Sequence, residues 1–232
     1  MGLISVPSST TGDDVLYAAR AARFLGGGVS FFFDDLHKSQ EWNKTTGGAG
    51  GAITNDATRV GGVMNILSGD SNASVAALGN ATPGYGLALP TGTGGEWYWA
   101  ARMQAAMTVT GASEYTLAGM ATATAPAVAN LKSWFGVNAG DSSTKFTFNF
   151  EVGGATLSSA NADQLFHVFE AYRVGGTTYC LIDGTQIGSG NLYFTTACAA
   201  VFVASPKAAL VATTLRADWI ALAIKATARV TS

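Results

Sequence analysis

The sequence predicts an all-β fold, an antiparallel β-sandwich preceded by a short N-terminal arm. Three observations lead to this prediction. The chain has 232 residues, a length that suits one large all-β domain. It contains 29 glycines, and clusters of Gly, Asn, Asp and Ser separate its strand-like segments as turns require. After residue 28 no segment has a convincing helical period, so the strands must pack against one another.

The N-terminal segment, residues 1–28, differs from the sandwich domain that we assign to residues 29–232. The stretch from Asp13 to Leu25 predicts a short helix, because it has two acids in its first turn and is followed by three glycines. Two alternatives stay open for this arm. It packs as a helix on its own domain, or it docks on a neighbouring subunit.

Alternation of apolar and polar residues marks the strands of the sandwich domain. In 145-KFTFNFEV-152 the phenylalanines fall on one face and polar side chains on the other. In 95-GEWYWAARMQAAM-107 the tryptophans share a face with small or flexible apolar residues, which is typical of an inner sandwich face. Further strand candidates are residues 29–35, 60–67, 84–89, 115–120, 133–138, 165–174, 177–183 and 213–225.

Two tight turns make residues 165–188 the clearest part of the topology. Gly175-Gly176 predicts a two-residue hairpin loop, and Asp183-Gly184 predicts a second one soon after it. Three successive strands therefore form a β-meander.

The composition excludes several classes of function. The net charge is −2 and no basic run occurs, so the chain is not expected to bind nucleic acid. No apolar run is long enough to span a membrane, and the N-terminus lacks the pattern of a secretion signal. Charged residues make up only 12% of the chain, and such a surface is poorly protected against association. We therefore expect a homo-oligomer, with a trimer as one option.

Few residues are suited to metal or redox chemistry. Cys180 and Cys198 are expected to be reduced and packed rather than joined in a disulfide, because no secretion signal precedes them. With only two histidines, a zinc site of three or four close ligands is not expected, and we predict no cofactor. The polar loops 70–72 and 138–143 leave only a weak Ca²⁺ site open.

No single strand carries a catalytic pair of acids. Glycoside hydrolysis uses two carboxyl groups about 5–5.5 Å apart for retention or about 6.5–9.5 Å apart for inversion. One strand supplies that spacing when its acids are two or four positions apart, and no strand candidate has such a pair. Asp218 shares its face with Arg216 and predicts a structural ion pair, and His167 predicts a partly buried ring with its partners satisfied. We expect no catalytic residues and no enzyme activity.

Several motifs, taken in order, resemble the concanavalin A-like lectin and glucanase superfamily, including its laminin-G-like members. The motifs are 31-FFFDDLHKSQEW-42, 60-VGGVMNILSG-69, 94-GGEWYWAARM-103, 134-WFGV-137, 167-HVFEAYRVGGTTYCLIDGTQIG-188 and 215-LRADWIALA-223. The resemblance implies a jelly roll over roughly residues 29–228, and it indicates fold much more than function.

Domains similar to this family occur in virion proteins of tailed bacteriophages. The resemblance therefore implies a non-enzymatic structural virion protein, namely a capsid decoration, a fibre or a tail appendage, assembled in the host cytoplasm. In that setting residues 1–28 would attach the subunit to the major capsid or tail protein. The side chains opposite the paired tryptophans, Glu96, Tyr98 and Arg102, are the candidate contact surface.

Two other hypotheses stay open. One is a carbohydrate-binding module that adheres to cell-surface glycans through an exposed aromatic ring, for which Trp42 and Trp134 are the candidates. The other is a glycoside hydrolase or polysaccharide lyase, which the missing pair of acids disfavours.

Overall fold

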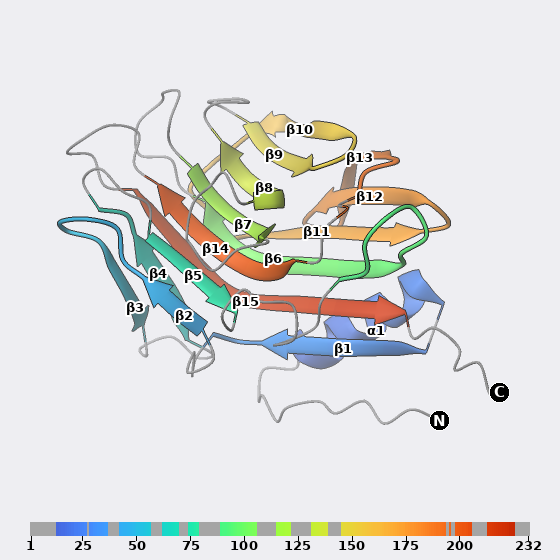
Figure 1. The fold of residues 1–232 in the computed structure, drawn as a ribbon, viewed down its shortest axis with the longest axis horizontal. Helices are drawn as coiled ribbons and strands as arrows, with labels where there is room; N and C mark the ends of the chain where they lie inside the picture. The colour runs from blue at the N-terminus through green and yellow to red at the C-terminus, as the bar shows by residue number, and fades with distance from the viewer. Residues whose placement is uncertain are drawn as a thin grey trace.

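The computed structural model consists of two antiparallel β-sheets packed face to face, with one helix against the first sheet (Figure 1). This confirms the predicted all-β sandwich. The residues that the structure describes are 13–26, 28–36, 42–56, 62–69, 74–78, 89–105, 115–121, 131–138, 145–193, 195, 198–205 and 213–225.

The first sheet has eight strands. Seven of them lie in the order β13 (Thr185–Gly190), β12 (Thr177–Ile182), β11 (His167–Val174), β6 (Trp97–Ala105), β15 (Thr214–Lys225), β4 (Val63–Leu67) and β3 (Ala52–Asp56). The eighth, β1 (Val29–Asp34), pairs with the second half of β15. Strand β15 therefore has β6 on one side, while β4 and then β1 share its other side.

The second sheet has seven strands. They lie in the order β10 (Gly154–Asn161), β9 (Lys145–Phe150), β8 (Leu131–Asn138), β7 (Tyr115–Ala121), β14 (Ala199–Ser205), β5 (Ser74–Leu78) and β2 (Trp42–Thr45). All the pairings in both sheets are antiparallel, as a sandwich built from hairpins and Greek-key connections requires.

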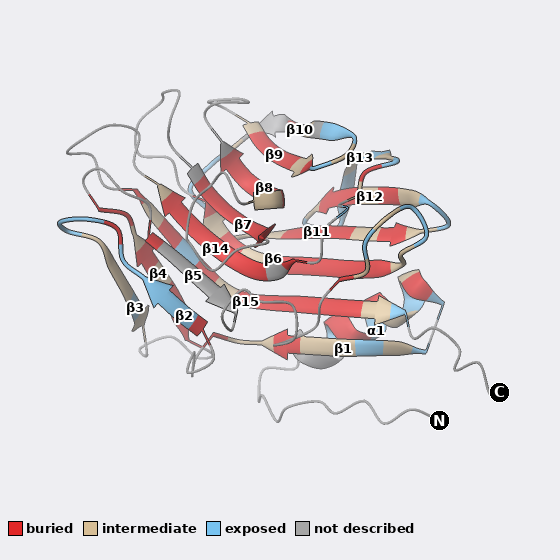
Figure 2. Cartoon of the chain, in the orientation of Figure 1, coloured by how far each residue is buried: buried red, intermediate tan, exposed pale blue. Residues whose placement is uncertain are grey.

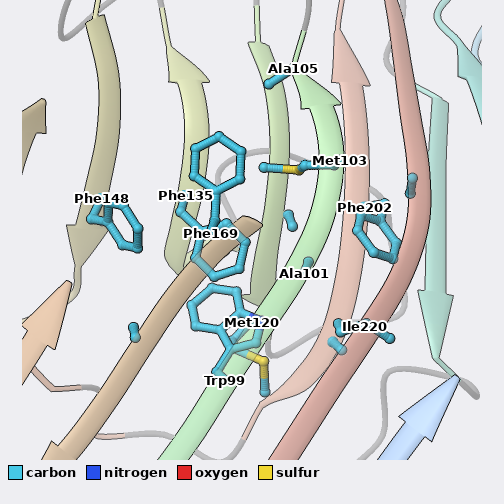
Figure 3. Close-up of a cluster of buried hydrophobic side chains, with 14 of the residues drawn as sticks. Trp99, Ala101, Met103, Ala105, Met120, Phe135, Phe148, Phe169, Phe202 and Ile220 are labelled. Atoms are coloured by element: carbon cyan, nitrogen blue, oxygen red, sulfur yellow. The ribbon is translucent and has the colours of Figure 1, made fainter. Parts of the chain in front are cut away.

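The facing sides of the two sheets enclose a continuous apolar core (Figure 2). The ring of Phe135 lies 4.1 Å from that of Trp99 and 5.6 Å from that of Phe169, measured between ring centroids. Met103 and Met120 lie beside these rings (Figure 3). The inner face predicted for residues 95–107 is confirmed, because its side chains are at most 1% exposed: Trp97, Trp99, Ala101, Met103 and Ala105.

Helix α1 (Asp13–Leu25) has the predicted bounds and packs on its own domain, across the outer face of the first sheet near the end of β15 (Figure 1). Its Tyr17 ring lies 4.3 Å from that of Trp219, and its Phe24 ring stacks 4.1 Å from that of Tyr172. Two residues of the helix itself, Ala21 and Leu25, are buried between the helix and the sheet. Residues 1–12 lie outside the described part of the chain, and attachment through this arm to another protein stays a prediction.

The predicted β-meander is confirmed as β11, β12 and β13. Both of its turns have two residues with positive φ, at Gly175-Gly176 and at Asp183-Gly184, which is the backbone that tight hairpins of this handedness need. The sequence did not predict five other strands, β2, β3, β5, β10 and β14. The candidate at residues 84–89 falls almost wholly outside the described residues.

Candidate functional site

The outer face of the first sheet is divided into a covered half and an open half. Helix α1 covers the second half of β15 with the neighbouring parts of β1, β6 and β11. The open half lies over β3, β4, the start of β15 and the end of β6. A bulge in β15 marks the boundary: Ala217 lies opposite Met103 and Trp219 opposite Arg102, so Asp218 is an extra residue.

A row of polar side chains crosses four strands of the open half. Thr54 of β3 lies opposite Asn65 of β4, and Asn65 lies opposite Arg216 of β15. Arg216 in turn lies opposite Gln104 of β6, and its Nη1 donates a hydrogen bond of 3.1 Å to Gln104 Oε1. Side chains at directly opposed positions of neighbouring strands lie close enough to act on one ligand together.

The open half is hollowed, with a cavity volume of about 310 Å³. We call this hollow the polar groove, and its lining is Ala52, Thr54, Asp56, Val63, Asn65, Leu67, Thr214 and Arg216. Apolar side chains lie among hydroxyl, amide, carboxylate and guanidinium groups in this set. A sugar ring offers matching chemistry, because it has apolar C–H faces and a rim of hydroxyls.

Two carboxylates lie on the open half. Asp56 lies opposite Val63 across β3 and β4, and Asp218 directly follows Ala217, which lies opposite Met64 of β4. The backbones of β3 and β15 are two strand spacings apart, about 10 Å.

Arg102 forms an ion pair with Asp218, and its guanidinium lies over the Phe166 ring, 5.0 Å from the centroid. The predicted ion pair of Asp218 with Arg216 is corrected, because the bulge turns this carboxylate toward β6.

A histidine held by two carboxylates lies at the start of β11, on the inner face of the first sheet, where its ring is 5.0 Å from that of Phe146 between centroids. His167 Nδ1 lies 2.6 Å from Asp183 Oδ2, and its Nε2 lies 2.8 Å from Asp163 Oδ1. Burial of the ring lowers its pKa, but the hydrogen bonds and charges of the two carboxylates outweigh burial, and the pKa is raised above 6.5. The predicted environment of His167, partly buried with both ring nitrogens satisfied, is confirmed.

The three side chains of the predicted contact surface do not lie together on an exposed surface. Tyr98 is fully buried under α1, and its hydroxyl donates a 2.7 Å hydrogen bond to Glu170 Oε1. Burial and then the nearby Glu170 carboxylate raise the pKa of Tyr98 well above its ordinary value. Glu96 binds Lys225 and accepts a hydrogen bond from the backbone N–H of residue 175. Only Arg102 lies in the open half.

Arg20 of α1 completes the buried network beneath the helix. Its Nε and Nη2 donate to the two oxygens of Glu170 at 2.9 Å and 2.7 Å, and this carboxylate is only 1% exposed. Such a fork is the strongest form of an arginine–carboxylate contact. The network therefore fixes the helix over the covered half.

The two candidate rings for sugar stacking are buried. Trp42 is 4% exposed, packs on Phe202 and donates its Nε1–H to Asp34 Oδ2 at 2.7 Å. Trp134 is 7% exposed. A stacking platform needs a free ring face, so the structure argues against the role expected of both residues.

Both cysteines are buried free thiols, as predicted. Burial raises the pKa of Cys180 and of Cys198 to about 12. Within the described ranges no three His, Cys, Asp or Glu side chains are grouped to hold a metal ion, and no helix is long and apolar enough to cross a membrane. The loop at residues 70–72 and nearly all of the loop at 138–143, which left a Ca²⁺ site open, fall outside those ranges.

Comparison with solved structures supports the fold. An apo Crh5 transglycosylase is similar with a TM-score of 0.54 and 12% identity, over 84% of this chain and 83% of its own. A prokaryotic β-1,3-1,4-glucanase (lichenase) from a mouse hindgut metagenome has a TM-score of 0.52 and 14% identity, over 83% and 98%. A carbohydrate esterase of Shiga toxin-encoding bacteriophage phi24B has a TM-score of 0.53 and 14% identity, over 86% and 100%. No protein-family model and no curated protein matches the sequence.

These likenesses confirm the predicted jelly-roll β-sandwich, and at such low identity they show the fold alone. They also correct one expectation. We expected a chain without enzyme activity, and this is contradicted because the similar structures are largely those of enzymes that act on glycans, the transglycosylase and the lichenase among them. Patterns along single strands do not reveal a pair of acids such as Asp56 and Asp218, which come from two different strands.

Proposed function

We propose that this chain is a glycan-active protein that binds a polysaccharide in the polar groove and acts on it with Asp56 and Asp218. One observation carries the proposal: the carboxylate of Asp56 lines an open hollow on the outer face of a jelly-roll sheet, and a second carboxylate, Asp218, follows the β15 residues that border the hollow. Solved structures with a similar fold, such as the lichenase, add support at the level of fold.

The groove supplies suitable groups for the recognition of sugar hydroxyls. Asn65 and Thr54 offer both donors and acceptors, and Arg216 offers donors only. Its guanidinium is oriented by Gln104, so less freedom is lost when a ligand binds. Sugar hydroxyls both donate and accept, and this mixture can pair with them.

The two carboxylates suit inverting rather than retaining hydrolysis. Their backbones are about 10 Å apart, which allows carboxyl groups at the separation of about 6.5–9.5 Å that inversion uses. Asp218 forms an ion pair with Arg102, and we assign it as the candidate base that activates water. Asp56 is then the candidate acid that protonates the leaving oxygen.

The test is a panel of neutral and acidic polysaccharides, with binding and release of reducing ends measured for each. Asp56→Asn and Asp218→Asn should each lower turnover by about 10²–10⁴-fold, the usual contribution of one acid or base. Glu151→Gln is the matched control, because this exposed carboxylate pairs with Lys132 in the other sheet. Absence of binding across the panel, or full turnover in both variants, would refute the proposal.

A bacteriophage particle is the second candidate setting, and a virion role is compatible with glycan activity. It is favoured by the likeness to the phage phi24B esterase, all of whose chain is covered. The low charge of the chain supports a homo-oligomer, for instance a trimer. Attachment to a capsid or tail protein would then use the N-terminal arm.

Because α1 is packed on its own sheet, the arm is tested by deleting residues 1–12 rather than 1–28. The shortened protein should stay folded and lose binding to purified particles. A full-length chain that is monomeric by light scattering and ignores particles would count against this setting.

A further inference from the structure

Three side chains at the start of β11 and in the turn after β12 form what we call the His167 clasp: Asp163, His167 and Asp183. Asp163 precedes β11, and Asp183 lies in the turn between β12 and β13. The two carboxylates also hold backbone: Asp163 Oδ1 accepts the N–H of Leu165 and Asp183 Oδ1 accepts the N–H of Val168, both at 2.8 Å. The clasp thus ties the segment before β11 to the turn between β12 and β13.

Both contacts of the imidazole need a proton on the ring. An ionised carboxylate only accepts hydrogen bonds, so each ring nitrogen that faces one must carry hydrogen. The ring is therefore the imidazolium in this geometry. A neutral imidazole has a single N–H, and one carboxylate would then face a nitrogen lone pair.

The clasp encloses a segment that borders the groove. Between Asp163 and His167, the carbonyl of Gln164 accepts a hydrogen bond from the side chain of Gln104, which in turn contacts Arg216. In the same segment the Phe166 ring lies under the guanidinium of Arg102. This segment therefore positions Arg216, through Gln104, and it positions Arg102, which pairs with Asp218.

We infer that His167 is a positioning residue of the polar groove: its doubly protonated ring holds residues 163–167 in place, and loss of one proton releases them. An effect of His167 on glycan binding depends on the proposed function, whereas the release of residues 163–167 does not. His167 touches no ligand in this scheme and acts through Gln104 and Arg102.

The direction of the pH dependence follows from the charges around the ring. Among the described residues, the charged groups facing it are Asp163 and Asp183, while β9 contributes the uncharged Phe146 ring at 5.0 Å. The pKa of His167 is raised in the folded chain, so the clasp is intact below about pH 6.5 and is lost as pH rises through the raised pKa.

The experiment measures the protonation of His167 and the protection of nearby amides in the absence of any ligand. The ring of His167 is titrated by NMR in the full chain, with His167→Gln to assign its signals, and exchange of the Leu165 and Val168 amides is measured over the same pH range. Beyond the intrinsic effect of pH, protection of both amides should fall about 10-fold or more as His167 loses its proton, since hydrogen bonds to charged groups are strong. In His167→Gln, which cannot titrate, the step should be absent.

A ring that titrates at or below about pH 6.5, or amides without a step, overturns the inference. Affinity for any polysaccharide found by the panel is then measured across the same range. A step in protection with no glycan bound at any pH supports the clasp and counts against the proposed function. A bound glycan with no step overturns the clasp and leaves the groove as the binding site.

Discussion

Replacing Arg20 with methionine tests how α1 is held on the sheet. Methionine keeps most of the apolar stem but removes the guanidinium, so of this network Glu170, which is 1% exposed, keeps only the hydrogen bond from the Tyr98 hydroxyl. Removing one partner of a buried ion pair typically costs about 3–5 kcal/mol. The Arg20 side chain is 32% exposed, and water screens part of the contact. We therefore expect a loss in the free energy of unfolding near the lower end, about 3 kcal/mol.

The assay is urea denaturation followed by tryptophan fluorescence, together with hydrogen exchange of the α1 amides. Arg23→Met is the matched control, since Arg23 is exposed on the same helix and should cost less than about 0.5 kcal/mol. Adding Glu170→Gln to Arg20→Met removes the unpaired charge and should recover part of the loss. If Arg20→Met is as stable as the control, or if the double variant recovers nothing, the argument that this ion pair fixes the helix is refuted.

Three further predictions concern the core, the thiols and the acid limb of stability. Phe135→Ala, in the middle of the buried ring cluster, should lower the free energy of unfolding by about 3–5 kcal/mol in urea titrations, and a loss below about 1 kcal/mol would contradict the packing. Cys180 and Cys198 should react with a thiol reagent at pH 8 only on unfolding, because burial raises their pKa to about 12; prompt labelling of the native chain would show otherwise. The hydrogen bond from Lys225 lowers the pKa of Glu96, so its stabilisation is present above about pH 4.3 and is lost as pH falls through the lowered value. Glu96→Gln should flatten that part of a stability–pH curve, and an unchanged curve would exclude this cause.

Sequence patterns predicted the elements whose signals are local. The helix from Asp13 to Leu25 has acids at its start and glycines after its end, and the alternation of β6 placed Trp97 and Trp99 in the core. The same counting put Tyr98 correctly on the opposite face. It could not show that α1 lies on that face, because the contact joins residues far apart in the chain.

The groove was missed for a related physical reason. Strand β3, with the sequence AITND, has no clean alternation, and none of its side chains is fully buried. Asp56 and Asn65 therefore gave no signal as strand residues. Period-two counting also does not show the bulge at Asp218, so it predicts an ion pair with Arg216, whereas the structure pairs Asp218 with Arg102. A site assembled from three strands depends on register, which single-strand patterns do not contain.

The bulge in β15 has a consequence for how this face can change. Asp218 is an extra residue in the pairing of β15 with β6. The core-facing side chains of β15 lie on both sides of it: Leu215 and Ala217 before it, and Ile220 and Leu222 after it. Deleting Asp218 would leave those side chains in step, so the strand could gain or lose a carboxylate here while the sandwich keeps its packing. Insertion or deletion of this one residue can therefore add or remove a carboxylate on the outer face without changing the packing of the core.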